Sequence, residues 1–136
     1  MSCNFFSLWI SGRVDGLKPR EAFKPWTAEE GDRRVRAWVQ EGKDFAEFKR
    51  DPFLALQLFI RLEEAFGEDL LSRMVIAYGG ARPENDADRI ALMAEKLSEL
   101  TKHDIAAVFQ NWNIPVSGTA AAKCRRYPAA PASVMP

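Results

Sequence analysis

The stretch DPFLALQLFIRLEEAFG, residues 51–67, begins and ends as a helix does and is apolar on nearly every side in between. Asp51 can accept hydrogen bonds from free backbone N–H groups, Pro52 suits the first helical position, and Gly67 suits the left-handed residue that ends a helix. A surface helix shows an apolar stripe, whereas a helix that is apolar almost all round is normally buried. The stretch therefore predicts a buried helix over 52–66, and the rest of the chain has to cover it.

The remaining sequence reads as further helices joined by short polar breaks, without a convincing alternating strand. Caps, glycines and apolar spacing predict helices at 2–14, from Thr27 to Gly42, at 44–49, at 68–78, from Asn85 to Leu100, and from Asp104 to a stop at Pro115. The expected fold class is all-α, a helical bundle around the central buried helix. Its core is expected to contain Leu56, Phe59, Ile60, Val108, Phe109 and Trp112.

The domain organisation follows from a change of composition near residue 117. Residues 1–116 are predicted to form one helical subdomain, truncated at its N-terminus because the first helix starts without a cap. Residues 117–136 are rich in Ala and Pro and poor in large apolar side chains. Such a composition favours disorder, so this tail is predicted to be disordered.

Charge and hydropathy exclude several functional classes. Lys plus Arg is 19 and Asp plus Glu is 19, so no net field directs the chain toward nucleic acid or an anionic membrane. Two local basic clusters remain, Arg33-Arg34-Arg36 and Lys123-Arg125-Arg126; the first alternates with acidic residues and is interpreted as a solvated helix face. No apolar run reaches the about 18 to 20 residues of a membrane span, and the start lacks the basic segment of a signal peptide.

Two cysteines and one histidine limit the chemistry further. Cys3 and Cys124 could pair, but two unpaired thiols in a reducing compartment are the preferred interpretation, which favours a cytoplasmic location. His103 is the single histidine, so a two-histidine zinc site cannot form, and a Ser-His-Asp triad or Cys-His pair would need His103 itself. Its place between two predicted helices favours a solvated or capping role. No Walker loop or GxGxxG run is present. We therefore expect no catalytic residue, no cofactor-binding residue and no metal ligand in this chain.

Two longer stretches carry a family resemblance: PFLALQLFIRLEEAFGEDLLSRMVIAY at 52–78 and ENDADRIALMAEKLSELTKHDIAAVFQNWNIPVS at 84–117. They resemble the carboxy-terminal helical part of the enhancin-like, mucin-targeting zinc metallopeptidases, peptidase family M-sixty of the gluzincin type. The matching features are Glu-Ala-Phe-Gly at 64–67, the Asn-Asp cap at 85–86 and Phe-x-x-Trp-x-Ile-Pro-Val-Ser at 109–117. The region is also similar to one in vertebrate factors that associate with the cold-sensing TRP channel.

The resemblance implies that the zinc site lies outside this chain. In the family, one helix carries His-Glu-x-x-His and a later helix supplies a glutamate as the third zinc ligand. The stretch SCNFFSLWI at 2–10 resembles the residues that follow this glutamate, with Ser2, Asn4 and the run 6–8 at matching positions. The complete family domain holds zinc, but none of its ligands carries over to this chain.

Three functions stay open at this stage: an inactive helical subdomain of a metallopeptidase, a non-catalytic protein-interaction module, and a helical adaptor unrelated to peptidases. The expected partner is the absent zinc-bearing half or another protein and not nucleic acid, and no membrane span is expected. A halved domain would expose apolar surface, and such patches mark association sites. Self-association is therefore expected through Phe5, Phe6, Leu8, Trp9 and Ile10.

Overall fold

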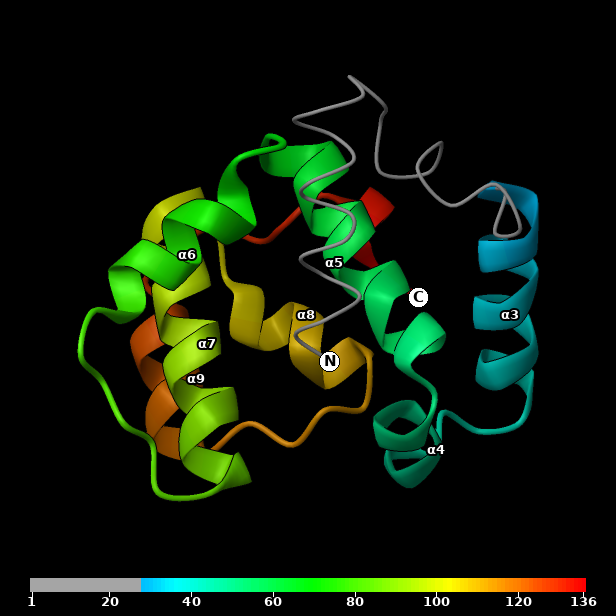
Figure 1. The fold of residues 1–136 in the computed structure, drawn as a ribbon, viewed down its shortest axis with the longest axis horizontal. Coiled ribbons are helices and arrows are strands. Elements are labelled where there is room, and N and C mark those ends of the chain that lie inside the picture. The colour runs from blue at the N-terminus through cyan, green and yellow to red at the C-terminus, as the bar shows by residue number, and fades with distance from the viewer. Residues whose placement is uncertain (1–27) are drawn as a thin grey trace. The chain divides into compact units, whose positions relative to one another are not determined.

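The computed structural model describes residues 28–136, and these residues form helices and no β-strand (Figure 1). The helices are α3 (Ala28–Gln40), α4 (Phe45–Arg50), α5 (Pro52–Phe66), α6 (Leu70–Tyr78), α7 (Asp86–Thr101), α8 (Ile105–Asn111) and α9 (Gly118–Cys124), followed by a 3-10 turn, η1 (Ala132–Val134). The all-α prediction is confirmed. The predicted helix at 2–14 and the predicted cap Thr27 lie outside the described residues.

The chain divides into two compact units, and the boundary between Glu64 and Ala65 falls within α5. Among the described residues, the first unit contains residues 28–64 and Pro136, and the second contains residues 65–135. The sequence had instead placed one subdomain at 1–116 with a separate tail. The division in the structure does not follow that boundary, since residues 117–135 lie in the second unit.

In the described part of the first unit, Trp38 connects α3 to the start of α4. Its buried indole N–H donates to the carbonyl of Asp44 at 3.0 Å, and its ring centroid lies 5.7 Å from that of Phe48. The Asp44 side chain caps α4 by accepting from the backbone N–H of Ala46 at 2.8 Å. An acceptor at this position satisfies an N–H group that the helix itself leaves unpaired.

Helix α5 is buried on nearly all sides, as its sequence predicted. Its buried residues are Leu54, Ala55, Leu56, Gln57, Leu58, Ile60, Leu62 and Glu63. Phe59, which the sequence also assigned to the core, is half-buried. Helix α3 packs closely against α5 at Gly31, where a β-carbon would overlap the side-chain amide of Gln57.

In the second unit, α7 packs against α6, α8 and α9 (Figure 1). Helices α7 and α9 run in the same direction. Glu95 on α7 pairs with Lys123 on α9, and Lys102 at the end of α7 meets Tyr127 just after α9. The buried side chains of this unit include Leu71, Ala94, Leu97, Ile105, Val108, Phe109, Trp112, Ala121 and Cys124. The last three core residues that the sequence predicted, Val108, Phe109 and Trp112, are thus buried in this unit.

The tail is the clearest departure from the sequence prediction, since residues 117–136 are folded and not disordered. Ser117 caps α9 by accepting from the backbone N–H of Ala120 at 3.2 Å. Further along, the carbonyl of Val134 accepts a hydrogen bond of 2.8 Å from the buried indole N–H of Trp112. Small buried side chains and main-chain acceptors hold this segment in place. Neither depends on the large apolar residues whose scarcity had suggested disorder.

None of the helices in residues 28–136 is both long and apolar enough to cross a lipid bilayer.

Candidate functional site

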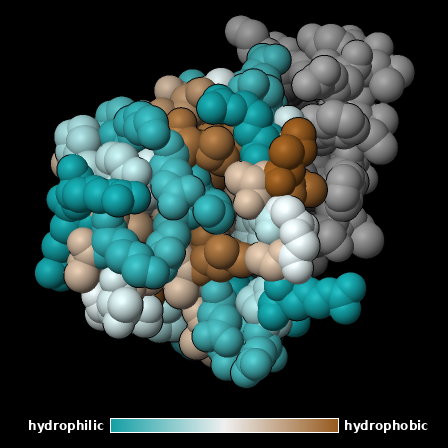
Figure 2. All heavy atoms as spheres, turned by 90° about the vertical axis from the view of Figure 1, so that its left-hand side faces the viewer, coloured by the Kyte–Doolittle hydropathy of each residue, from teal (hydrophilic) through white to brown (hydrophobic). Residues whose placement is uncertain are grey.

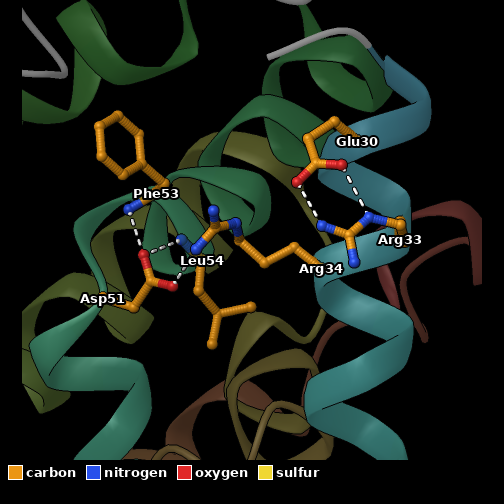
Figure 3. A network of polar contacts seen from close by, with 6 residues as sticks. All are labelled: Glu30, Arg33, Arg34, Asp51, Phe53 and Leu54. Carbon is orange, nitrogen blue, oxygen red and sulfur yellow. Dashed lines mark hydrogen bonds and ion pairs between the residues drawn. The ribbon is translucent and has the colours of Figure 1, made fainter. Parts of the chain in front are cut away.

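Asp51 lies at the centre of a polar network in the first unit (Figure 3). Its Oδ1 accepts hydrogen bonds from the backbone N–H groups of Phe53 at 2.9 Å and Leu54 at 3.1 Å. Its Oδ2 lies 2.6 Å from Nη1 of Arg34 on α3. One carboxylate therefore caps α5 and also ties that helix to α3. All of these contacts stabilise the packing of α5 on α3.

The rest of the basic cluster on α3 is solvated, as predicted. Arg33 forms two hydrogen bonds of 2.6 and 2.7 Å with the carboxylate of Glu30, and Arg36 is exposed. The hydrogen bond from the Arg33 guanidinium lowers the pKa of the Glu30 carboxyl below its ordinary value. The prediction is incomplete only at Arg34, which is partly buried against Asp51.

His103 follows the end of α7 and is half-buried. Its Nδ1 lies 2.7 Å from the carbonyl oxygen of Thr101, and its ring centroid lies 5.0 Å from that of Phe66. The Thr101 contact is local, whereas Phe66 is the last residue of α5. Within residues 28–136 no group of three His, Cys, Asp or Glu side chains is placed to hold a metal ion.

Of the two cysteines, Cys124 is buried on α9 with a free thiol, and Cys3 lies outside the described residues. The structure therefore places Cys124 as a packing residue of the second unit. The predicted apolar association residues Phe5, Phe6, Leu8, Trp9 and Ile10 also lie outside the described part of the chain.

An exposed basic surface lies where α7 and α9 end, and we call its four residues, Lys102, Arg125, Arg126 and Tyr127, the Tyr127 surface. The Lys102 Nζ atom lies 5.9 Å from the centroid of the Tyr127 ring, and the Arg126 guanidinium carbon lies 4.9 Å from it. All three cationic residues are exposed, and Tyr127 is half-buried. The sequence showed the cluster at 123–126 but gave no sign that Lys102 joins it.

The outer side of α6 carries a small apolar surface. Ile76 is 78% exposed and Val75 is 49% exposed, whereas Leu70, Leu71 and Met74 of the same helix are buried. Figure 2 faces the side of the molecule that lies on the left in Figure 1 and shows hydrophobic residues set among hydrophilic ones. Partial burial raises the pKa of the Tyr78 phenol at the end of this helix.

The family model of peptidase M60, enhancin and enhancin-like proteins matches residues 1–113. The chain is also 25% identical over 117 residues to human TRPM8 channel-associated factor 2, an alignment that covers 85% of this chain and 12% of that protein. The Danio rerio TRPM8 channel-associated factor homolog is likewise 25% identical over 117 residues, with 85% and 13% covered.

The chain spans about an eighth of the length of these curated relatives. No solved structure matches it. The family match, in contrast, includes α3 to α8 and most of the chain. Among the helices that it covers, α5 to α8 are those whose sequences carry the resemblance. The chain therefore belongs to the family of peptidase M60, enhancin and enhancin-like proteins.

Proposed function

We propose that this chain is the carboxy-terminal helical part of an M60-type zinc metallopeptidase domain and is catalytically inactive alone. The observation that carries the proposal is that the 136 residues contain one histidine. Catalytic zinc is bound by three protein ligands and keeps a fourth position open, and the motif His-Glu-x-x-His needs two histidines on one helix. The zinc-binding motif therefore cannot be formed from this sequence.

The surroundings of His103 support the same proposal. Its Nδ1 is engaged with the Thr101 carbonyl, and its ring packs against Phe66. The carboxylate next to it in sequence, Asp104, caps α8 by accepting from the N–H of Ala107 at 3.0 Å. These side chains stabilise the junction between α7 and α8. In this proposal the helical part supports a zinc-bearing part of the domain and contributes no ligand to it.

A second candidate function is a non-catalytic protein-interaction module. The relatives named TRPM8 channel-associated factors favour it, because these names describe association with another protein. Within this chain, the exposed Ile76 and the Tyr127 surface are the features that support it.

The first candidate is tested by measuring zinc in the purified chain and cleavage of a mucin-type glycoprotein. We expect far less than one zinc ion per chain and no cleavage. His103→Ala is the matched variant, since it removes the one imidazole. Stoichiometric zinc that His103→Ala abolishes would contradict the proposal, and so would cleavage that a chelator inhibits.

A gene-level observation separates the two candidates. An upstream reading frame that encodes His-Glu-x-x-His, joined to this chain, should restore zinc binding if the helical part belongs to a peptidase. If that longer protein folds but holds no zinc, the interaction module becomes the better proposal.

A further inference from the structure

We propose that the Tyr127 surface binds an acidic segment of a partner protein. This inference deepens the interaction-module candidate and rests on it. Two exposed cationic side chains, Lys102 and Arg126, lie against the ring of Tyr127 at the ends of α7 and α9, and the exposed Arg125 is next to Arg126 in the sequence. Arg and Tyr are, together with Trp, enriched among the side chains that dominate protein–protein binding.

The charges of this surface are not neutralised by residues 28–136. In the described part of the chain, no carboxylate forms an ion pair with Lys102, Arg125 or Arg126. Two acidic residues of α7 are engaged elsewhere, since Glu95 pairs with Lys123 at 3.1 Å and Glu99 pairs with Lys96 at 3.1 Å. The adjacent Asp104 uses its Oδ1 to cap α8. The carboxylates of a partner can therefore form ion pairs with Lys102, Arg125 and Arg126 without displacing a carboxylate of residues 28–136.

The backbone beneath this surface is fixed before any partner arrives. The N–H of Lys102 donates to Ser98 at 2.9 Å, that of Arg125 to Ala121 at 3.1 Å, and that of Tyr127 to Cys124 at 3.0 Å. The adjoining Asp104 N–H donates to the Pro128 carbonyl at 2.8 Å, which ties the two chain segments together. A surface held in this way loses less conformational entropy on binding than a mobile loop does.

The geometry favours an acidic protein segment over other anions. The Lys102 and Arg126 charges lie against a ring, and the backbone N–H groups of Lys102, Arg125 and Tyr127 already donate to main-chain carbonyls, so these N–H groups are not available to a phosphate. Membrane recruitment by charge usually uses clusters of about four to eight basic residues, more than the three present here. Nucleic-acid binding usually accompanies a strongly basic domain, whereas the pI of this chain is 6.6.

The test uses the full chain and a fluorescein-labelled, glutamate-rich peptide of about twelve residues, long enough when extended to span the surface. Anisotropy titrations compare the parent chain with Lys102→Glu, Arg126→Glu and the double variant. Exposed ion pairs contribute little individually, so we expect each reversal to weaken binding about threefold to fivefold and the double variant about tenfold or more. Binding of the parent chain should also weaken as salt rises.

The matched control is Arg73→Glu, which reverses an exposed charge on α6 of the same unit. It should bind the peptide within about twofold of the parent chain. Circular dichroism checks that every variant is folded, and Lys102→Gln with Arg126→Gln replaces the reversals if they unfold the chain. These neutral changes should weaken binding in the same order.

Three results would overturn the proposal. One is a failure of the mutations to matter: either the parent chain does not bind the peptide, or the parent chain and the double variant bind it equally well. Another is an equal loss from Arg73→Glu, which would indicate a general charge effect. The third is tighter binding of phosphatidylserine vesicles or single-stranded DNA than of the peptide. None of these results changes the expected outcome of the zinc and cleavage measurements. Failure of the acidic-segment proposal is therefore distinguishable from failure of the inactive-subdomain proposal.

Discussion

A single carboxylate, that of Asp51, performs two stabilising tasks in the first unit. One oxygen accepts from two backbone N–H groups at the start of α5, and the other pairs with Arg34. The sequence could predict the first task, because an aspartate followed by Pro52 is a local signal for a helix start. It could not predict the second, since the partner lies on another helix.

Substitutions at Asp51 should separate these two tasks. Asp51→Ala removes both and is expected to lower the free energy of unfolding by about 1 to 2 kcal/mol from the cap, plus the smaller contribution of the ion pair. Asp51→Asn keeps a capping oxygen and loses the charge, so its cost should be about 1 kcal/mol or less. Urea denaturation of the full chain measures both values.

The exposed ion pair on α3 provides the control. Arg33 is 65% exposed at its side chain, and solvent screens such a pair, so Glu30→Gln should leave the free energy of unfolding nearly unchanged. If Asp51→Asn costs as much as Asp51→Ala, the ion pair with Arg34 is the stronger contribution and the cap the weaker one.

At the scale of elements, the sequence predicted helices well where their start signals are local. Asn85 accepts from the N–H of Asp88 at 2.9 Å, and Asp104 accepts from that of Ala107 at 3.0 Å, as expected from their positions. The tail was missed because its order depends on residues far away in sequence. The Tyr127 surface could be predicted only in part for the same reason. Its arginines are adjacent in sequence, but Lys102 is brought to it by the packing of α7 on α9.

Shortening the chain to end at residue 127 should destabilise the second unit. The change removes the buried side chain of Val134 and also removes the acceptors of the Trp112 indole and the Asp104 N–H. Burial of a valine and satisfaction of a buried donor are each worth about 1 to 3 kcal/mol, so we expect a loss of about 3 kcal/mol or more. Thermal and urea unfolding report it.

Val134→Ala is the matched variant for this shortening, since it keeps the backbone acceptor and removes only apolar contacts. Its cost should be smaller, about 1 to 2 kcal/mol. A shortened chain that unfolds at the same urea concentration as the full chain would show that η1 and the residues before it contribute no stability.

For the whole molecule, the prediction that remains is self-association. The segment at 5–10 contains five large apolar side chains in six positions, and large apolar patches favour association wherever a protein exposes them. We expect the full chain to form oligomers as its concentration rises. The double variant Phe6→Glu with Trp9→Glu should shift it toward the monomer in light scattering.

Ile76→Glu is the comparison for this prediction, because Ile76 is the most exposed large apolar side chain of α6. It should leave the oligomers intact if the segment at 5–10 drives association. Monomers at every concentration would refute the prediction. Dissociation by Ile76→Glu alone would assign the contact to α6.

The hydrogen bond between the Trp112 indole and Val134 has a consequence for how such proteins diverge. The family match stops at residue 113, yet the partner of Trp112 lies at residue 134. That partner is a main-chain carbonyl, which every amino acid carries. Selection on this contact would act on the path of the chain and hardly at all on residue identity. Related chains could keep the same path while their tail sequences lose all detectable similarity, so the limit of a sequence family need not be the limit of its fold.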